Sequence, residues 1–535
     1  MALPHHRVKK HLIGRFSSLH YEHPSFRWWV LVNVMIGTFI AVLDATIVNV
    51  GLPKIMASFG ATIDSIEWII TAYMLVMGVM LPTSGWVADH FGYKRTYFGS
   101  LLLFTIGSFL CGLSWNENVL IASRVVQGIG AGFMMPVGMA IVLREFSHKE
   151  RGLALGCWAI AAAASVSFGP LIGGYLIDNF SWQAIFYVNI PIGLFGMIAT
   201  LIIQREYRTE KTRSFDLVGF LSMSVFLSFL LLALAEGNAS WNIGGWTSDF
   251  MLACFGLSLA GLAVFLLTEL SVQHPFIELR LLKEFNFGIS NLVLFIFGIS
   301  MFGSTFLLPL YLQNSLGYTA IQAGMVFLPV GILQAVTSVI SGILSDRVNQ
   351  KVPIVAGIVL LAASMYMNSF ISLFSEHLQI MLPLYIRGLS LGLLFTPLST
   401  LSLARIPREK IAQASGIFNV IRQIGGSFGV AIFGAMLTRR TLFHTAVYGQ
   451  AVSQNSPQFQ VVTNNLAHFI QQSGGGTLSR AAAQARALIG SHIAQQAFVQ
   501  AVADNFFLAA AVSLAAIVPI LFISNTRSGS SKLSS

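Results

Sequence analysis

Long runs of apolar residues, separated by short polar segments, dominate this chain of 535 residues. A helix that crosses a bilayer needs roughly 20 mostly apolar residues, and runs of about that length recur along the whole sequence. They lie near 28–50, 67–88, 97–114, 119–142, 153–177, 184–203, 217–235, 250–272, 287–312, 321–344, 353–374, 380–403, 412–437 and 503–523. This pattern predicts an all-α polytopic membrane protein with about fourteen spans.

The composition excludes an ordinary soluble domain. Hydrophobic residues make up 55% of the chain and charged residues only 10%, whereas about a quarter of a soluble domain is charged. Residues 1–27 are basic, and the first apolar run is too long for the core of a cleaved signal peptide, so we expect it to remain as a span. The cysteines Cys111, Cys157 and Cys254 have no metal-ligand spacing, and no metal site is expected.

The distribution of Lys and Arg predicts the orientation. An even number of spans places both termini on one side, and most of the 31 Lys and Arg residues fall in loops on that side. Only Lys54, Arg439, Arg440, Arg480 and Arg486 fall on the opposite side. The positive-inside rule therefore predicts cytoplasmic termini and a location in the cytoplasmic (inner) membrane. The net charge of +10 reflects this topology, so the lipid bilayer is the expected partner and nucleic acid is not.

An internal repeat divides the chain into two halves. Lys149-Glu150-Arg151 and Ser167-Phe168-Gly169 are echoed by Arg408-Glu409-Lys410 and Ser427-Phe428-Gly429. Parallel six-helix repeats are the plan of major-facilitator transporters, whose binding site lies at the midplane between the halves. The predicted parts are a cytoplasmic segment 1–27, a six-helix bundle 28–203, an inserted hairpin with its loops 204–286, a second bundle 287–523 with an external loop 439–502, and a cytoplasmic tail 524–535.

Asp44 is the only charged residue between Arg27 and Lys54. An ionised side chain at membrane depth is costly unless it faces a partner or a polar cavity, so Asp44 is a candidate proton-binding residue. Small residues share its helical stripe and indicate that this face packs inward. A hydrogen-bonded structural Asp is the alternative. Thr46 and Asn49 are candidates for the same region, or for hydrogen bonds between helices.

Further polar residues lie inside other spans. Arg124 and Gln127 share one face of the fourth span, where Arg124 could enter the bundle and act on a neighbouring carboxyl, or could snorkel to the membrane surface. For Arg387 of the twelfth span, snorkelling is equally compatible with the pattern. A third set lies in the thirteenth span as either a polar contact of the second half or a structural pair: Asn419, Arg422 and Gln423.

Five ordered motifs resemble those of the fourteen-helix drug:proton antiporters of the EmrB/QacA type, with a layout most similar to EmrB, within the major facilitator superfamily. The motifs are Leu43 to Pro53, Gly85 to Arg95, Arg124 to Gly130, Gly169 to Gly174, and Trp182 with Phe186 to Gly193. The sequence departs from the family pattern in two places. Ser165 stands where the family usually has glycine, and Trp182-Gln183-Ala184 stands where the family usually has Trp-Arg-Trp. The resemblance implies two pseudo-symmetric six-helix bundles plus two inserted helices.

The resemblance also assigns roles outside the first span. It implies a cytoplasmic gate in which charge pairs around Asp89, Lys94 and Arg95 hold one conformation, with a solvated turn as the alternative. The gate residues are Gly85, Asp89, Gly92 and Arg95, with Asp346 and Arg347 in the second half. The residues of the antiporter motif, which permit close helix packing or a kink, are Gly169, Pro170, Gly173 and Gly174.

These observations predict a proton-driven exporter of lipophilic or amphipathic small molecules, with no enzymatic activity. No Gly-Lys dipeptide occurs, so a P-loop of the usual form is absent; we expect no cofactor, and the proton gradient as the driving force. Alternatives are an exporter of one metabolite, such as a fatty acid or siderophore, and a membrane scaffold. The resemblance further suggests that a periplasmic adaptor of the EmrA type docks on 439–502, which could equally be a lid.

Overall fold

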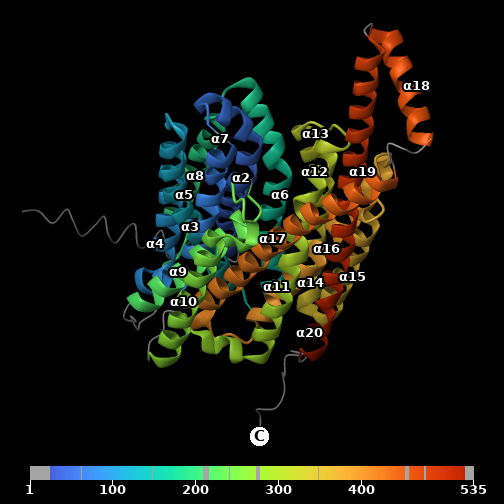
Figure 1. Ribbon diagram of the computed structural model, residues 1–535. Coiled ribbons are helices and arrows are strands. Elements are labelled where there is room, and N and C mark those ends of the chain that lie inside the picture. The colour runs from blue at the N-terminus through green and yellow to red at the C-terminus, as the bar shows by residue number, and fades with distance from the viewer. Residues whose placement is uncertain are drawn as a thin grey trace, which may run out of the picture.

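The computed structural model describes residues 25–61, 63–147, 149–208, 216–239, 241–272, 277–347, 349–451, 457–474 and 477–523. Within these ranges the regular structure is helical, with no strand (Figure 1). This confirms the all-α fold class. The long apolar runs have no other way to satisfy their backbone groups in lipid, since a helix makes all of its backbone hydrogen bonds within one segment.

The first half of the chain forms one bundle of helices. Asn116 caps its fourth long helix by accepting a hydrogen bond from the backbone N–H of Val119 at 2.8 Å. Its helices are α2 (Phe26–Phe59), α3 (Ile63–Phe91), α4 (Tyr93–Gly112), α5 (Glu117–Glu145), α6 (Arg151–Asn179), α7 (Ala184–Tyr187) and α8 (Asn189–Ile203).

An additional helical pair follows the first bundle. It consists of α9 (Leu217–Glu236) and α10 (Asp249–Ser271), which are capped by Asp216 and Ser248. The pair is attached to both halves: α9 packs against α3 and α17, and Asn238 donates a hydrogen bond to the carbonyl of Ala431 at 3.2 Å. The inserted hairpin is therefore packed onto the bundle.

The second half repeats the helical plan and ends in a long projection. Its helices are α11 (Phe285–Thr305), α12 (Leu307–Asn314), α13 (Ala320–Met325), α14 (Leu328–Arg347), α15 (Lys351–Asn368), α16 (His377–Leu403), α17 (Ile411–Ala451), α18 (Pro457–Gly474), α19 (Leu478–Ala515) and α20 (Ile517–Phe522). Helix α18 and the first part of α19 project beyond the other helices (Figure 1). The described part of the segment 439–502 is thus mostly helical, and α19 continues from Leu478 directly into the last span.

Thirteen segments of the described chain are long and apolar enough to cross a membrane, and each coincides with one predicted run. The remaining run, 97–114, corresponds to α4. This helix has 20 residues and so spans about 30 Å. It begins with Tyr93-Lys94-Arg95-Thr96, which makes it less apolar than the others. The fold therefore agrees with roughly fourteen spans in a polytopic membrane protein.

The two halves meet along α6 and α14, where glycines allow the backbones to approach closely. A Cβ atom on Gly156 would lie 2.4 Å from the carbonyl oxygen of Ser338, and one on Gly342 would lie 2.2 Å from that of Gly152. A second contact joins α3 to α17, where a Cβ on Gly85 would lie 2.8 Å from the Cα of Gln413. Small residues at such positions are typical of helix packing in membranes.

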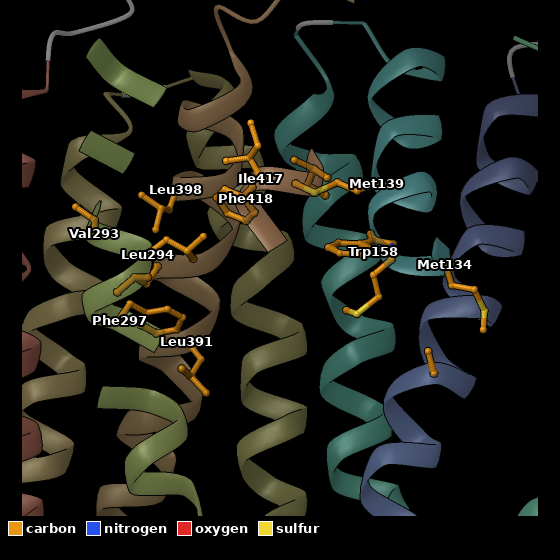
Figure 2. Packing of buried hydrophobic residues seen from close by; sticks show 14 of the residues in the cluster. Met134, Met139, Trp158, Val293, Leu294, Phe297, Leu391, Leu398, Ile417 and Phe418 are labelled. Carbon is orange, nitrogen blue, oxygen red and sulfur yellow. The ribbon is translucent and has the colours of Figure 1, made fainter. Parts of the chain in front are cut away.

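Most of the buried apolar side chains form one cluster that includes residues of both halves, beside three smaller clusters. In Figure 2, Met134, Met139 and Trp158 of α5 and α6 lie on one side of the view. Phe297, Leu391 and other side chains of α11 and α16 lie on the other side, and Ile417 and Phe418 of α17 lie between the two groups. Helix α17 therefore contributes to the core where the halves adjoin.

We predict that Gly156→Ala lowers the thermal unfolding midpoint of the purified protein in detergent, because the new methyl group would contact the α14 backbone. Overpacking of this kind costs about 1–3 kcal/mol. The matched control is Gly99→Ala, since a Cβ there meets no atom within 4 Å. That change should leave the midpoint unchanged or raise it slightly, because Ala has the higher helix propensity. Equal midpoints for the two variants would contradict the close α6–α14 contact.

Candidate functional site

A buried carboxylate lies at the centre of the first bundle. Asp44 of α2 has an exposed fraction of 0%. It accepts hydrogen bonds from Arg124 Nη1, from Gln127 Nε2 at 2.8 Å and from Asn189 Nδ2 at 3.1 Å. These donors come from α5 and α8, so the site joins three helices of one bundle. The prediction that Asp44 points inward is confirmed.

Arg124 forms an ion pair with Asp44, and both side chains are almost completely buried. Its Nε donates to the carbonyl of Ile69 at 3.1 Å, and its guanidinium carbon lies 4.0 Å from the centre of the Tyr73 ring. Arg124 and Gln127 lie three residues apart on α5, which places both on the face toward α2. The snorkelling alternative for Arg124 is therefore wrong.

A second layer of polar groups holds the donors in place. Ser108 of α4 accepts hydrogen bonds from Gln127 at 2.7 Å and from Asn189 at 3.1 Å. Gln127 also accepts from Arg124 Nη1 at 2.6 Å. A Cβ on Gly107 would lie 2.6 Å from the Cα of Gln127, so this glycine permits the approach of α4 to α5. The amide of Gln127 is thus fixed from both sides.

Asn189 and Ser108 were not among the predicted site residues. Both are buried, Asn189 with an exposed fraction of 0%. The sequence contains one indication of a role for Asn189. It is a lone amide inside the apolar run 184–203, in the stretch that resembles the family. The packing of four helices decides which polar residues lie beside Asp44. The sequence of any one segment does not contain that information.

The chemistry of this site follows from its charge. The Asp44 carboxylate is stabilised by one cation and two amide N–H donors, while a buried charge without such partners is very unfavourable. A proton on Asp44 would neutralise the carboxylate and leave the Arg124 guanidinium without its counter-charge. The arrangement of α2, α5 and α8 is therefore coupled electrostatically to the protonation of one carboxyl.

Thr46 and Asn49 lie outside the hydrogen-bond network of Asp44. Thr46 donates to the carbonyl of Leu43 at 2.9 Å and faces α6, where a Cβ on Gly169 would collide with its hydroxyl. Asn49 is exposed and donates to the carbonyl of Ala45 at 3.3 Å. Their role in a proton or substrate pathway stays a prediction.

The polar residues of the second half form separate groups. Arg387 is 2% exposed and donates to the carbonyl of Met301 at 3.1 Å and to the hydroxyl of Thr305. The snorkelling alternative is therefore wrong for Arg387 as well. Arg422 is only partly buried and donates to Asn419 Oδ1 at 3.3 Å, and the neighbouring Gln423 is also partly buried.

Asp89 lies near the C-terminal end of α3 and contacts residues of α4 and α5. It accepts a hydrogen bond from the Tyr93 hydroxyl at 3.0 Å, and its carboxylate lies 4.0 Å from Arg144 of α5. Arg95 pairs with Glu206 at 3.7 Å. Asp89 and Arg95 therefore each take part in a charge pair, and Arg95, which lies at the start of α4, turns toward the segment after α8.

Two glycines shape the same region. Gly85 is the residue that lies against Gln413 of α17, and Gly92 has a backbone φ of 96°, which favours glycine. A Cβ on Gly92 would also collide with the Glu206 carboxylate. The side chains of Asp346 and Arg347, at the end of α14, lie outside the described residues. The gate function stays a prediction.

The antiporter motif of α6 packs against two other helices. Gly169 and Gly173 lie against Thr46 and Ile47 of α2. Gly174 lies against Ile321 of α13, where a Cβ on Gly324 would in turn lie 2.4 Å from Pro170. Close packing of α6 between the halves thus accounts for these small residues. Ser165, which departs from the family pattern, donates to the carbonyl of Phe39 at 2.9 Å.

The described residues contain no group of three or more His, Cys, Asp or Glu side chains that could hold a metal ion.

Comparison with known proteins gives the family. Residues 34–430 match the model of the Major Facilitator Superfamily, so the chain belongs to this superfamily of membrane transporters. Similar proteins include the multidrug export protein EmrB of Escherichia coli, which is 29% identical over 90% of this chain and 92% of its own length. The multidrug resistance protein Stp of Mycobacterium tuberculosis is 33% identical over 76% of this chain and 75% of its own.

Two further comparisons extend this result. The fatty acid resistance protein FarB of Neisseria gonorrhoeae is 28% identical over 92% of this chain and 95% of its own length. The crystal structure of the human organic anion transporter MFSD10 has a TM-score of 0.59, covering 92% of this chain and all of that one, at 12% identity. The structural likeness supports the fold alone. The sequence relatives identify a transporter of the EmrB/QacA type.

We predict that Asp44 and Arg124 are strongly coupled in stability. Arg124→Gln should lower the free energy of unfolding by about 3–5 kcal/mol, because it leaves a buried carboxylate without its cation. In the double variant Asp44→Asn/Arg124→Gln the loss should be smaller than the sum of the two single losses. The measurement is a double-mutant cycle of unfolding free energies for the purified protein.

Arg95→Gln is the control for this cycle, since Arg95 is exposed and its pair with Glu206 should contribute at most about 1 kcal/mol. Additive losses for Asp44 and Arg124 would show that the two side chains do not depend on each other, contrary to the geometry.

Proposed function

We propose that this protein is a proton-coupled exporter of lipophilic or amphipathic small molecules. The observation that carries the proposal is the completely buried Asp44, held by Arg124, Gln127 and Asn189 from two other helices. A membrane protein with no need to bind protons gains nothing from an ionisable group at this depth, which is costly to place there.

The proposed cycle uses the charge of Asp44 as its switch. A proton that reaches Asp44 from the outside neutralises the carboxylate and releases Arg124, which favours a different packing of α2, α5 and α8. Loss of the proton to the cytoplasm restores the ion pair. Rocking of the halves about the α6–α14 and α3–α17 contacts then exposes the substrate site alternately to the two sides. The proton gradient supplies the energy, and no cofactor takes part.

The names of the relatives support the class of substrate, and the distribution of Lys and Arg supports the location. EmrB and Stp are named as multidrug export and multidrug resistance proteins, so we assign small lipophilic molecules and protons as the substrates. We place the protein in the cytoplasmic membrane with both termini in the cytoplasm, because Lys and Arg concentrate in the loops on that side. An enzymatic activity is not proposed.

A second candidate is an exporter dedicated to one metabolite such as a fatty acid. The name of FarB, a fatty acid resistance protein, favours this alternative. The two candidates share the proton-coupling mechanism and differ only in substrate range, so a panel of substrates distinguishes them.

We also propose that the external helical hairpin docks a periplasmic adaptor of the EmrA type. Helices α18 and α19 pack through small residues, Ala467 against Ala481 and Ala485. Exposed apolar side chains remain on α18, among them Val461, Val462 and Phe469. A hairpin that served only as a lid would need no such outward apolar surface.

We expect cells that produce the protein to export a lipophilic dye, and Asp44→Asn to abolish this export, because an amide carries no titratable proton. A protonophore should abolish export by the unchanged protein. The measurement is the initial rate of dye loss from preloaded cells, at equal amounts of protein in the membrane.

Asp178→Asn is the matched control, since Asp178 is an exposed carboxylate at the end of α6. Its export rate should equal that of the unchanged protein. Continued export by Asp44→Asn would remove Asp44 from the coupling mechanism. Export that persists in the presence of the protonophore would contradict the proton as the driving ion.

A further inference from the structure

Two arginines lie inside helices of the second bundle, whereas its acidic residues lie near helix ends or, as Asp504 of α19, already pair with Arg440 and His444. Between residues 285 and 437 the only acidic residues are Asp346, Glu376 and Glu409. Asp346 lies at the end of α14, Glu376 caps the start of α16, and Glu409 lies in the short η3 helix (Arg408–Lys410). Within the helices, by contrast, lie Arg387 and Arg422. The first bundle differs, because its Arg124 is neutralised by Asp44.

Arg387 is surrounded by neutral partners. It donates to the Met301 carbonyl and the Thr305 hydroxyl, and its buried Nη1 has no hydrogen-bond partner. No described carboxylate forms an ion pair with it. Its positive charge is therefore uncompensated by the protein residues that the structure describes.

Arg422 lies at the boundary between the two halves and is partly exposed. Its Nη2 donates to Asn419 Oδ1 at 3.3 Å and lies 4.0 Å from the sulfur of Met135, which belongs to α5 of the first half. Its guanidinium carbon lies 5.9 Å from the centre of the Phe302 ring of α11. The buried Nε of Arg422 has no hydrogen-bond partner, and among the described residues no carboxylate pairs with this side chain.

The two guanidinium groups flank the same turn of α11. Arg387 contacts Met301 and Thr305, and Arg422 faces Phe302 between them. Two positive charges beside one turn of a membrane-spanning helix make the local electrostatic potential more positive, and this favours the binding of an anion. An uncompensated buried charge is unfavourable, so any anion that reaches this site is bound more strongly than it would be in water.

We propose that Arg422 binds the carboxylate of an anionic amphiphile, with Arg387 of α16 adding to the positive potential. This inference rests on the proposed export function and specifies its substrate class. The planar guanidinium of Arg422 presents paired N–H donors that match a carboxylate, and Asn419 orients it from one turn away on α17. Met135, Met301 and Phe302 provide adaptable apolar surface for a hydrocarbon tail of variable shape.

The test uses three probes with the same twelve-carbon tail and different head groups: laurate, dodecanol and dodecyltrimethylammonium. Their binding is measured on the full-length protein in lipid nanodiscs. Laurate should bind more tightly than dodecanol, and Arg422→Gln should weaken laurate binding at least about tenfold, equivalent to roughly 1.4 kcal/mol. The variant should leave dodecanol unchanged and should not weaken dodecyltrimethylammonium. Arg422→Lys, which keeps the charge, should recover part of the loss.

Arg439→Gln is the control, because Arg439 is exposed on the external part of α17. It should change none of the three affinities. Equal weakening of all three probes by Arg422→Gln would assign Arg422 a structural role and overturn the inference. Unchanged laurate binding by the same variant would also overturn it.

An export assay separates this inference from the proposed function. If the unchanged protein exports a cationic dye under a proton gradient while laurate neither binds nor is exported, the anion site is wrong and the exporter stands. If laurate binds through Arg422 but none of the probes or dyes is exported, the exporter is wrong and the anion site stands. Export of laurate that is lost in Arg422→Gln, with cationic dye export retained, supports both.

Discussion

A carboxylate that water cannot reach must be compensated by the protein itself, and the first bundle is organised around that requirement. Asp44 is balanced by Arg124, and the amides of Gln127 and Asn189 satisfy its remaining oxygen. Because these groups come from α2, α5 and α8, the position of each helix depends on one charge. A proton, which is the smallest change that can remove the charge, can thereby act on the packing of a whole bundle.

The two halves have the same helical plan but differ in how their buried charges are compensated. The first contains a neutral ion pair, whereas the second contains Arg387 and Arg422 with no described counter-charge. In the proposed exporter this asymmetry separates two tasks, since proton binding belongs to one bundle and substrate recognition to the other. The glycine-lined contact of α6 with α14 connects them, so a shift in either bundle is transmitted to its partner.

Several features were predictable because they depend on local patterns. Each apolar run became a helix, since hydropathy and length suffice for that inference. The inward direction of Asp44 and the shared face of Arg124 and Gln127 followed from helical periodicity. That the charge near Asp89 is Arg144, by contrast, depends on the packing of α5 beside α3, which no single segment of the sequence contains. For the same reason, the sequence did not predict that Asn189 and Ser108 belong to the site.

The sequence alone thus determined the membrane class, the helices and their twofold repeat. It also showed that charged residues lie inside the spans, where an uncompensated charge is energetically costly. Only the tertiary structure decided which of those charges are neutralised. Hydropathy and periodicity are properties of one segment, whereas an ion pair such as Asp44 with Arg124 joins residues 80 positions apart. Its existence depends on how the helices pack, and so does the absence of a described carboxylate beside Arg422.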